Sequence, residues 1–201
     1  PHDFASNIKY FLQKNGVLIL EIEYLHNFIK NLEYERFYFD RPFYYSANSI
    51  NYLFKKYEMT LYDIEFIDTH GGSIRLFIKN SNFTKKTNRC KNILKKENKS
   101  LTYKNFEIFK SRVIKESEVL YKKLINKRKS DELIIGYGAP ARVSTITNFS
   151  KINSSLIDYI IDDSPIKQNK FTPGSHIKIL PKLKNINKNI KIVIVFAYEY
   201  F

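Results

Sequence analysis

The chain has almost no cysteine and no long apolar stretch. Cys90 is its one cysteine among 201 residues, which excludes an internal disulfide framework and a metal cluster built from thiolates of this chain alone. No apolar run reaches the roughly 18 to 20 residues needed to span a bilayer, and the first residues lack the basic-then-apolar layout of a signal peptide. These absences favour a cytoplasmic protein without a membrane partner.

Negative charge is also scarce. The sequence has 34 Lys and Arg against 20 Asp and Glu, a formal net charge of +14. Such an excess is found in proteins that bind nucleic acid, an anionic membrane surface or an acidic small molecule. The cations are scattered along a chain rich in Lys, Asn and Ile, and no module that reads bases is recognisable. We therefore expect no nucleic-acid partner.

Both ends of the sequence are expected to be cut. The chain opens on Pro1 rather than Met, and it stops at Phe201 shortly after a strongly apolar run. A natural terminus is usually a polar, frayed tail. The 43% hydrophobic and 15% aromatic content is enough to bury a sizeable core, in one large domain or two small ones.

The first part of the chain has the pattern of an α/β fold. Asp3 and Ser46 are expected to cap helices whose apolar residues recur at helical spacing, and a short helix is expected over 25–32. Residues 17–22 form a nearly continuous apolar run, which is typical of a strand covered on both faces in a parallel sheet. Residues 61–67 and 74–78 are expected to form an antiparallel pair at a sheet edge.

A linker is predicted over residues 81–101, which are polar and almost without apolar periodicity. A long helix is predicted over 102–129. Residues 133–149 then read as strand, glycine turn and helix, the opening of a nucleotide-binding βαβ unit. With further strands at 156–161 and 190–197, we expect a second, incomplete Rossmann-like α/β domain over 102–201.

The glycine turn and the loops beyond the next strand are candidate ligand contacts. Glycines let the backbone approach a phosphate, and the following helix presents its positive end; a plain tight turn is the alternative. Lys167, two residues after Pro165, can contact a diphosphate or remain a solvated charge. Substrate-binding candidates here are Gly136, Tyr137, Gly138, Lys167 and Gln168.

The turn Thr69-His-Gly-Gly-Ser-Ile-Arg75 lies between two strand-like runs. Its paired glycines allow positive φ and a close approach to another group. A His, a Ser and an Arg supply a titratable ring, a hydroxyl and a fixed cation. This composition suits ligand contact better than packing.

The loop of residues 37–46 places six aromatic rings around the pair Asp40-Arg41. Aromatic rings exclude water, and tyrosine hydroxyls can orient a substrate oxygen. The alternative is an aromatic mini-core closed by a salt bridge.

Taken in order, these motifs resemble those of the sugar C-methyltransferases, which act on nucleotide-linked deoxysugars with S-adenosylmethionine. The resemblance implies that residues 1–80 are the C-terminal part of a methyltransferase Rossmann domain and that 102–201 are the C-terminal C-methyltransferase domain. The glycine loop for S-adenosylmethionine, and a zinc module usual in the family, would precede this chain. We therefore assign it no cofactor-binding residue and no metal ligand. The matching stretches are Gly16–Glu21, Tyr38–Ser46, Thr69–Arg75, Gly136–Ala141, Asp162–Gln168 and Pro173–Ile177.

The chain departs from the family at its catalytic signature, Tyr-His-Glu-His, which reads Tyr38-Phe39-Asp40-Arg41 here. The family's second His is thought to remove the proton beside a keto group, and methyl transfer to the resulting enolate follows. An Arg is always protonated and cannot be this base, although it can stabilise an enolate or hold a phosphate. Tyr38, Asp40 or His70 remains as a base, or the C-methylation step has been lost.

The resemblance implies catalytic roles for Tyr38, Asp40, Arg41 and His70, and substrate contacts in the first part of the chain at Tyr44, Ser46, Gly71, Gly72, Ser73 and Arg75. The predicted function is C-methylation of a nucleotide-linked keto-deoxysugar. The alternatives are a catalytically altered or inactive relative that binds a nucleotide-sugar, and a dinucleotide-binding oxidoreductase, which the glycine turn supports weakly. The sugar, the carbon methylated, the nucleotide and the oligomeric state stay open.

Overall fold

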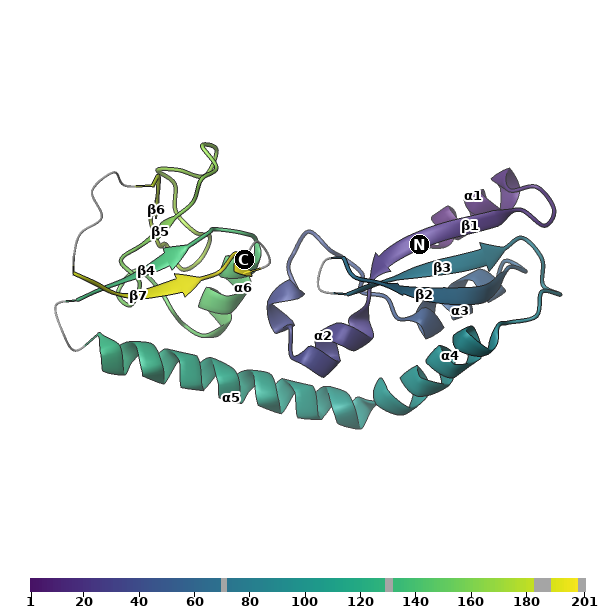
Figure 1. Ribbon diagram of the computed structural model, residues 1–201, viewed down its shortest axis with the longest axis horizontal. Coiled ribbons are helices and arrows are strands. Elements are labelled where there is room, and N and C mark those ends of the chain that lie inside the picture. The colour runs from purple at the N-terminus through teal and green to yellow at the C-terminus, as the bar shows by residue number, and fades with distance from the viewer. Residues whose placement is uncertain (70–71, 129–131, 183–188, 199–201) are drawn as a thin grey trace. The chain divides into compact units, whose positions relative to one another are not determined.

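The computed structural model describes residues 1–69, 72–128, 132–182 and 189–198, and the chain divides into two compact units (Figure 1). The first unit comprises Pro1–Glu33 and Pro42–Phe109, and the second comprises Tyr34–Arg41 and Lys110–Phe201. The short segment Tyr34–Arg41, which we call the inserted segment, therefore belongs to the second unit although the first unit flanks it in sequence.

The first unit contains a three-stranded antiparallel sheet in the order β1, β3, β2. Residues of β3 alternate between the two faces, so Ile74, Leu76 and Ile78 are all fully buried in the core between sheet and helices. The strands are β1 (Val17–Glu23), β2 (Thr60–Ile67) and β3 (Ser73–Lys79), and the helical elements are α1 (His2–Phe11), α2 (Leu25–Asn31), the 3₁₀ turn η1 (Tyr34–Arg36), α3 (Ala47–Lys55) and α4 (Asn88–Ser100).

The predicted antiparallel pair is confirmed, since Leu61 pairs with Ile78 and Ile67 with Ser73. The expectation of a parallel interior strand at 17–22 is wrong, because β1 runs antiparallel to β3, its one partner among the described strands. A continuous apolar run indicates a strand, but it does not show the direction of the partner. Ile19 on the face away from the helices is 58% exposed.

Of the two predicted helix N-caps, one is confirmed. Ser46 caps α3, where its Oγ accepts a hydrogen bond from Ser49 N at 3.1 Å and Ser49 Oγ accepts one from Ser46 N. The predicted cap Asp3 instead lies in the first turn of α1, whose N-cap is Pro1. An acidic residue in that turn still complements the positive end of the helix.

The linker prediction for 81–101 is also wrong, because Asn88–Ser100 form α4. Thr87 caps this helix through a hydrogen bond from Cys90 N to Oγ1 at 3.1 Å. Its buried face consists of Cys90, Ile93, Leu94 and Glu97, so one of the four inward positions is charged. The apolar periodicity is therefore too weak to show in the sequence, and the two units divide at Phe109–Lys110 instead.

The second unit contains a four-stranded parallel sheet in the order β6, β5, β4, β7. The predicted order of strand, glycine turn and helix is confirmed by β4 (Leu133–Tyr137) and α6 (Arg142–Phe149). The core includes the fully buried Ile134, Ile157 and Ile160. The remaining elements are the long helix α5 (Tyr103–Lys127), which begins in the first unit, and the strands β5 (Tyr159–Ile161), β6 (Ile179–Leu180) and β7 (Ile190–Val195).

Candidate active site at the carboxyl edge of the parallel sheet

The glycine turn after β4 passes very close to its neighbours. Gly138 has a φ of 78°, and a Cβ built there would lie 2.4 Å from the Cβ of Ala197. A Cβ on Gly136 would lie 2.7 Å from Ile160 Cγ1. Both positions therefore require glycine, and the turn lies directly beside the residues that follow β7.

The carboxylate of Asp162, at the end of β5, holds this turn. Its Oδ2 accepts a hydrogen bond from Ala139 N at 2.6 Å, and its Oδ1 accepts one from Ser164 N at 2.9 Å. Burial raises the pKa of Asp162. The two N–H donors and the Lys167 ammonium together lower it by more, so the net pKa lies below its ordinary value. Asp162 is thus a buried anion that fixes the backbone of the turn.

Two of the predicted substrate contacts also bind Asp162. Lys167 Nζ lies 3.5 Å from Asp162 Oδ2, and Gln168 Nε2 donates to the backbone oxygen of Asp162 at 3.0 Å. Tyr137 points its hydroxyl to the neighbouring Asp163, donating to Oδ2 at 3.2 Å. The charge of Asp163 raises the pKa of this phenol.

The inserted segment packs on α6 and on the chain after β7. Tyr198 donates its hydroxyl to Glu35 Oε1 at 2.6 Å, and Thr145 Oγ1 donates to the backbone oxygen of Phe37 at 3.1 Å. The ring of Tyr34 lies 5.6 Å from that of Phe149. Three side chains of the parallel-sheet unit therefore hold the segment.

Arg142, the first residue of α6, completes a polar cluster with the buried Glu35 and the more exposed Tyr198. Its guanidinium lies 4.7 Å from the centre of the Tyr198 ring, within the range of a cation–π contact. Burial raises the pKa of Tyr198 to about 12, and the hydrogen bond to Glu35 adds to this shift. We refer to Glu35, Tyr198 and Arg142 as the Glu35 cluster; it adjoins the glycine turn, since Tyr198 follows Ala197.

Three of the predicted catalytic residues lie three to six residues after Glu35 in the chain. Tyr38 and Arg41 close a turn, in which Arg41 N donates to Tyr38 O at 3.2 Å. The guanidinium of Arg41 lies 4.9 Å from the centre of the Tyr38 ring, and Asp40 between them is exposed. The second unit thus contains Tyr38, Asp40 and Arg41 together with the predicted contacts Gly136, Tyr137, Gly138, Lys167 and Gln168.

The other described candidates lie in the first unit. The ring of Tyr44 packs edge-on against Phe28, with centroids 6.2 Å apart. The hydroxyl of Ser46 is the buried cap of α3. In the hairpin turn, Gly72 has a φ of 104°, and Ser73 Oγ donates to Thr69 O at 3.1 Å. His70 and Gly71 lie outside the described residues.

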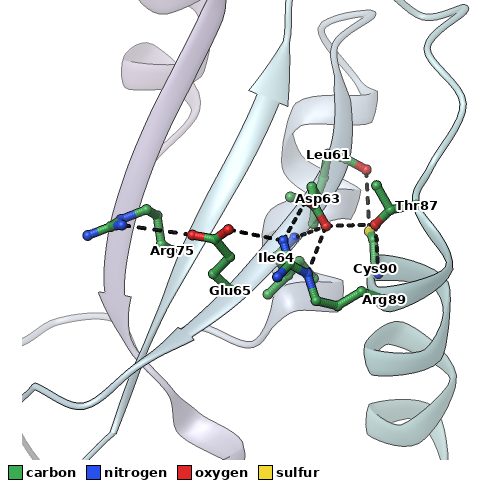
Figure 2. A network of polar contacts seen from close by, with 8 residues as sticks. All are labelled: Leu61, Asp63, Ile64, Glu65, Arg75, Thr87, Arg89 and Cys90. Carbon is green, nitrogen blue, oxygen red and sulfur yellow. Dashed lines mark hydrogen bonds and ion pairs between the residues drawn. The ribbon is translucent and has the colours of Figure 1, made fainter.

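Arg75 takes part in an ion-pair network across the strands of the first unit. Its Nη2 lies 2.6 Å from Glu21 Oε1, and its Nη1 lies 3.8 Å from Glu65 Oε2. Glu65 also pairs with Arg89, which binds Asp63 at 2.6 Å, so the charges continue toward α4 (Figure 2). This network already neutralises the guanidinium that the sequence assigns to a substrate.

The sequence analysis missed the Glu35 cluster. Arg142 stands at the start of a predicted helix, and Tyr198 follows a strand at the edge where ligands bind in open α/β sheets. The sequence positions of Arg142 and Tyr198 could therefore have indicated two of the three residues of the cluster. The partner Glu35 lies 163 residues from Tyr198, so no local pattern connects them.

Within the described residues, no three or more His, Cys, Asp or Glu side chains gather where they could hold a metal ion. A separate search of the same residues finds no helix both long enough and apolar enough to cross a membrane.

Comparison with known proteins identifies the family. The sequence model of the C-methyltransferase C-terminal domain matches residues 68–201, more than half of the chain. The chain therefore belongs to this C-methyltransferase family, which confirms the resemblance drawn from its motifs. Among curated proteins, the C-methyltransferase NovU of Streptomyces niveus is 25% identical over 184 residues, covering 89% of this chain and 43% of NovU. The chain thus spans less than half the length of that relative.

Proposed function

We propose that this chain supplies the substrate-binding and enolate-forming groups of an S-adenosylmethionine-dependent C-methyltransferase that acts on a nucleotide-linked keto-deoxysugar. One observation carries the proposal. The segment with the signature residues Tyr38, Asp40 and Arg41 packs in the same unit as the glycine turn after β4. A ligand with a diphosphate at the turn would therefore extend toward a phenol, a carboxylate and a guanidinium.

The diphosphate end of such a ligand suits the glycine turn. Glycine at 136 and 138 keeps the turn tight, because Ile160 and Ala197 fill the space that a Cβ would take there; α6 begins four residues after Gly138, where helix N–H groups favour negative charge. Arg142 at the start of α6 and Lys167, whose Nζ lies 3.5 Å from Asp162 Oδ2, add positive charge. This arrangement supports a nucleotide-sugar as the substrate.

The sugar end requires a base and a stabiliser of negative charge. We assign the base to Tyr38, Asp40 or His70, which would take the proton from the carbon beside the keto group. The electron pair of that C–H bond moves into the enolate, whose oxygen the fixed cation of Arg41 would stabilise. Asp40 is exposed to solvent, which suits a base that must return its proton to water.

S-adenosylmethionine supplies an electrophilic methyl group when it is bound. The described residues of the first unit do not form a cradle for it: their glycines, at 16 and 72, precede β1 or lie in the hairpin turn, and neither joins a strand to a following helix. We therefore assign no step of the reaction to cofactor contacts in this chain. We also propose a cytoplasmic location, because the one cysteine is a buried free thiol.

A second candidate is a relative that binds the nucleotide-sugar without methylating it. The observation that favours it is Arg41, which occupies the signature position of the family's basic His and stacks on Tyr38. A guanidinium holds a phosphate or an oxyanion well but does not accept a proton.

Three measurements on the complete gene product separate these functions: calorimetric binding of a nucleotide-linked keto-deoxysugar, solvent deuterium exchange at the carbon beside its keto group, and transfer of labelled methyl from S-adenosylmethionine. Binding with exchange and transfer supports the methyltransferase. Binding without exchange and transfer supports the second candidate, and absence of binding contradicts both.

A further inference from the structure

The inserted segment is attached to the second unit by polar contacts that the proposed reaction does not use. Glu35 is 8% exposed and Arg36 is 3% exposed, although both carry charge and lie in a 3₁₀ turn at the start of the segment. Burial of a charged group is costly unless that group is hydrogen-bonded or paired. The short hydrogen bond from Tyr198 to Glu35, at 2.6 Å, offsets this cost.

These contacts fix the backbone just before the signature residues. The side chain of Glu35 is bound by Tyr198, and the carbonyl of Phe37 is bound by Thr145. The chain is thus held at positions 35 and 37, three residues and one residue before Tyr38. The turn from Tyr38 to Arg41 is then closed by its own backbone hydrogen bond.

The partners of the segment come from two elements that also build the glycine turn. Arg142 starts α6, which directly follows the turn, and its guanidinium stacks on the Tyr198 ring. Tyr198 is one residue beyond Ala197, whose Cβ would contact a Cβ at Gly138. A displacement of Tyr198 therefore changes the distance between Tyr38 and the turn.

We propose that Glu35 and Tyr198 are positioning residues: through their hydrogen bond they set the place of Tyr38, Asp40 and Arg41 relative to the glycine turn, without touching substrate. This inference rests on the proposed function. It predicts that loss of the hydrogen bond impairs proton removal more than substrate binding, because chemistry depends on angstrom-scale alignment whereas the diphosphate contacts stay in place.

The test uses the complete gene product and its tyrosine and glutamate variants. Tyr198→Phe removes the donor and Glu35→Ala removes the acceptor, whereas Glu35→Gln keeps an acceptor oxygen. Tyr121→Phe is the matched control, because Tyr121 is a half-buried tyrosine that packs its ring on the core of the same unit. Each protein is assayed for kcat and KM of deuterium exchange into a nucleotide-linked keto-deoxysugar, and for its melting temperature.

We expect Tyr198→Phe and Glu35→Ala to lower kcat by about 10- to 100-fold with KM within about twofold, a loss typical of a small misplacement of reacting groups. Glu35→Gln should restore most of kcat, Tyr121→Phe should match the wild type, and the double variant Glu35→Ala/Tyr198→Phe should be no worse than either single variant. Unchanged kcat in Tyr198→Phe, or a loss in Glu35→Gln as large as in Glu35→Ala, would overturn the inference.

A second measurement does not depend on catalysis. Backbone amide hydrogen exchange of a peptide covering the inserted segment should accelerate in Tyr198→Phe and stay at the wild-type rate in Tyr121→Phe. Equal rates in all three proteins would overturn the positioning role even in an inactive relative. If the wild type neither binds nor exchanges the sugar while the segment loosens as expected, the proposed function fails and the hydrogen bond is shown to hold the segment.

Discussion

Asp162 shows how one carboxylate can fix a glycine turn. It accepts hydrogen bonds from the backbone of Ala139 and Ser164, so Asp162→Ala leaves two N–H groups without their acceptor. We expect the free energy of unfolding to fall by about 2 kcal/mol or more, measured by urea unfolding. The control is Asp163→Ala, since Asp163 is exposed; a loss as large in that variant would contradict the assignment.

Two carboxylates, Asp162 and Asp158, make the stability of the second unit depend on pH. Burial raises the pKa of both Asp158 and Asp162, but hydrogen bonds from Arg128 and Ile134 N to Asp158, and from backbone N–H groups to Asp162, lower it more. Folded carboxyls with pKa values below the ordinary value of about 3.9 bind fewer protons than unfolded ones. Their stabilisation is therefore present above that value and is lost as the pH falls through the folded pKa.

Melting temperatures between pH 7 and pH 3 test this dependence. The wild type should lose stability as the pH falls, and Asp158→Asn should show a shallower loss, because one of the two carboxyls no longer titrates. A steeper loss in the variant would show that Asp158 does not have the lowered pKa.

In the proposed function, Arg41 decides which activity the signature segment supports. Arg41→His replaces a permanent cation by a ring that accepts a proton near neutral pH. Since a general base contributes about 10²- to 10⁴-fold, we expect deuterium exchange of a keto-sugar by the complete gene product to rise at least about tenfold. Arg112→His, on the exposed surface of α5, is the control; no gain over that control argues against Arg41 as the residue that limits proton removal.

At the level of elements, α3 depends on two caps from different parts of the chain. Ser46 is its local cap, and the buried carboxylate of Glu97 in α4 accepts hydrogen bonds from Ala47 N and Asn48 N, each at 2.7 Å. An anion at a helix N-terminus is also favoured by the helix dipole. This contact joins α3 to α4 and explains why a charged residue lies on the inner face of α4.

Replacement of each cap separates the two contributions. We expect Ser46→Ala to cost about 1 kcal/mol, and Glu97→Ala to cost more, about 2 to 3 kcal/mol, because buried N–H groups lose a charged acceptor. Chemical denaturation measures both, with Glu116→Ala on the exposed surface of α5 as the control. A larger cost for Ser46→Ala than for Glu97→Ala would show that Ser46 is the main cap and would contradict the prediction.

The elements that the sequence predicts are those with local signals. The turn at Gly136 and Gly138 is encoded by residue type, and the hairpin strands by alternation. Helix α4 was hidden because Glu97, on its inner face, is stabilised by α3 rather than by apolar packing. The pairing direction of β1 was hidden as well, since strands of either direction can have the same apolar run.

At the scale of the whole molecule, β1 leaves apolar surface exposed. Val17 and Ile19 lie on the sheet face away from the helices and are 40% and 58% exposed, and β1 has one partner among the described strands. An exposed apolar edge strand promotes association between chains. We expect the isolated 201-residue chain to aggregate, and Ile19→Lys to reduce its aggregation without lowering its melting temperature.

Light scattering and size-exclusion chromatography test this expectation. The control is Leu20→Lys, because Leu20 faces the core and a buried cation there should unfold the first unit. A wild-type chain that stays monodisperse and melts cooperatively would contradict the prediction.

The division into units was the feature that the sequence predicted least well. Composition places the boundary within 81–101, whereas the contacts place it at Phe109–Lys110 and add Tyr34–Arg41 to the second unit. The hydrogen bonds responsible join residues 108 and 163 positions apart. Motif order revealed the family, but only three-dimensional contacts show which unit holds the signature residues.

The inserted segment also limits how this protein can be recombined. Consider a chimaera that takes residues 110–201 from one homologue and residues 1–109 from another. Its Tyr198 then faces residue 35 of a different protein, which need not be the glutamate that accepts its hydrogen bond here. Exchange of the parallel-sheet unit as a working module therefore requires two separate stretches of the gene to be transferred together, or complementary substitutions at positions 35 and 198.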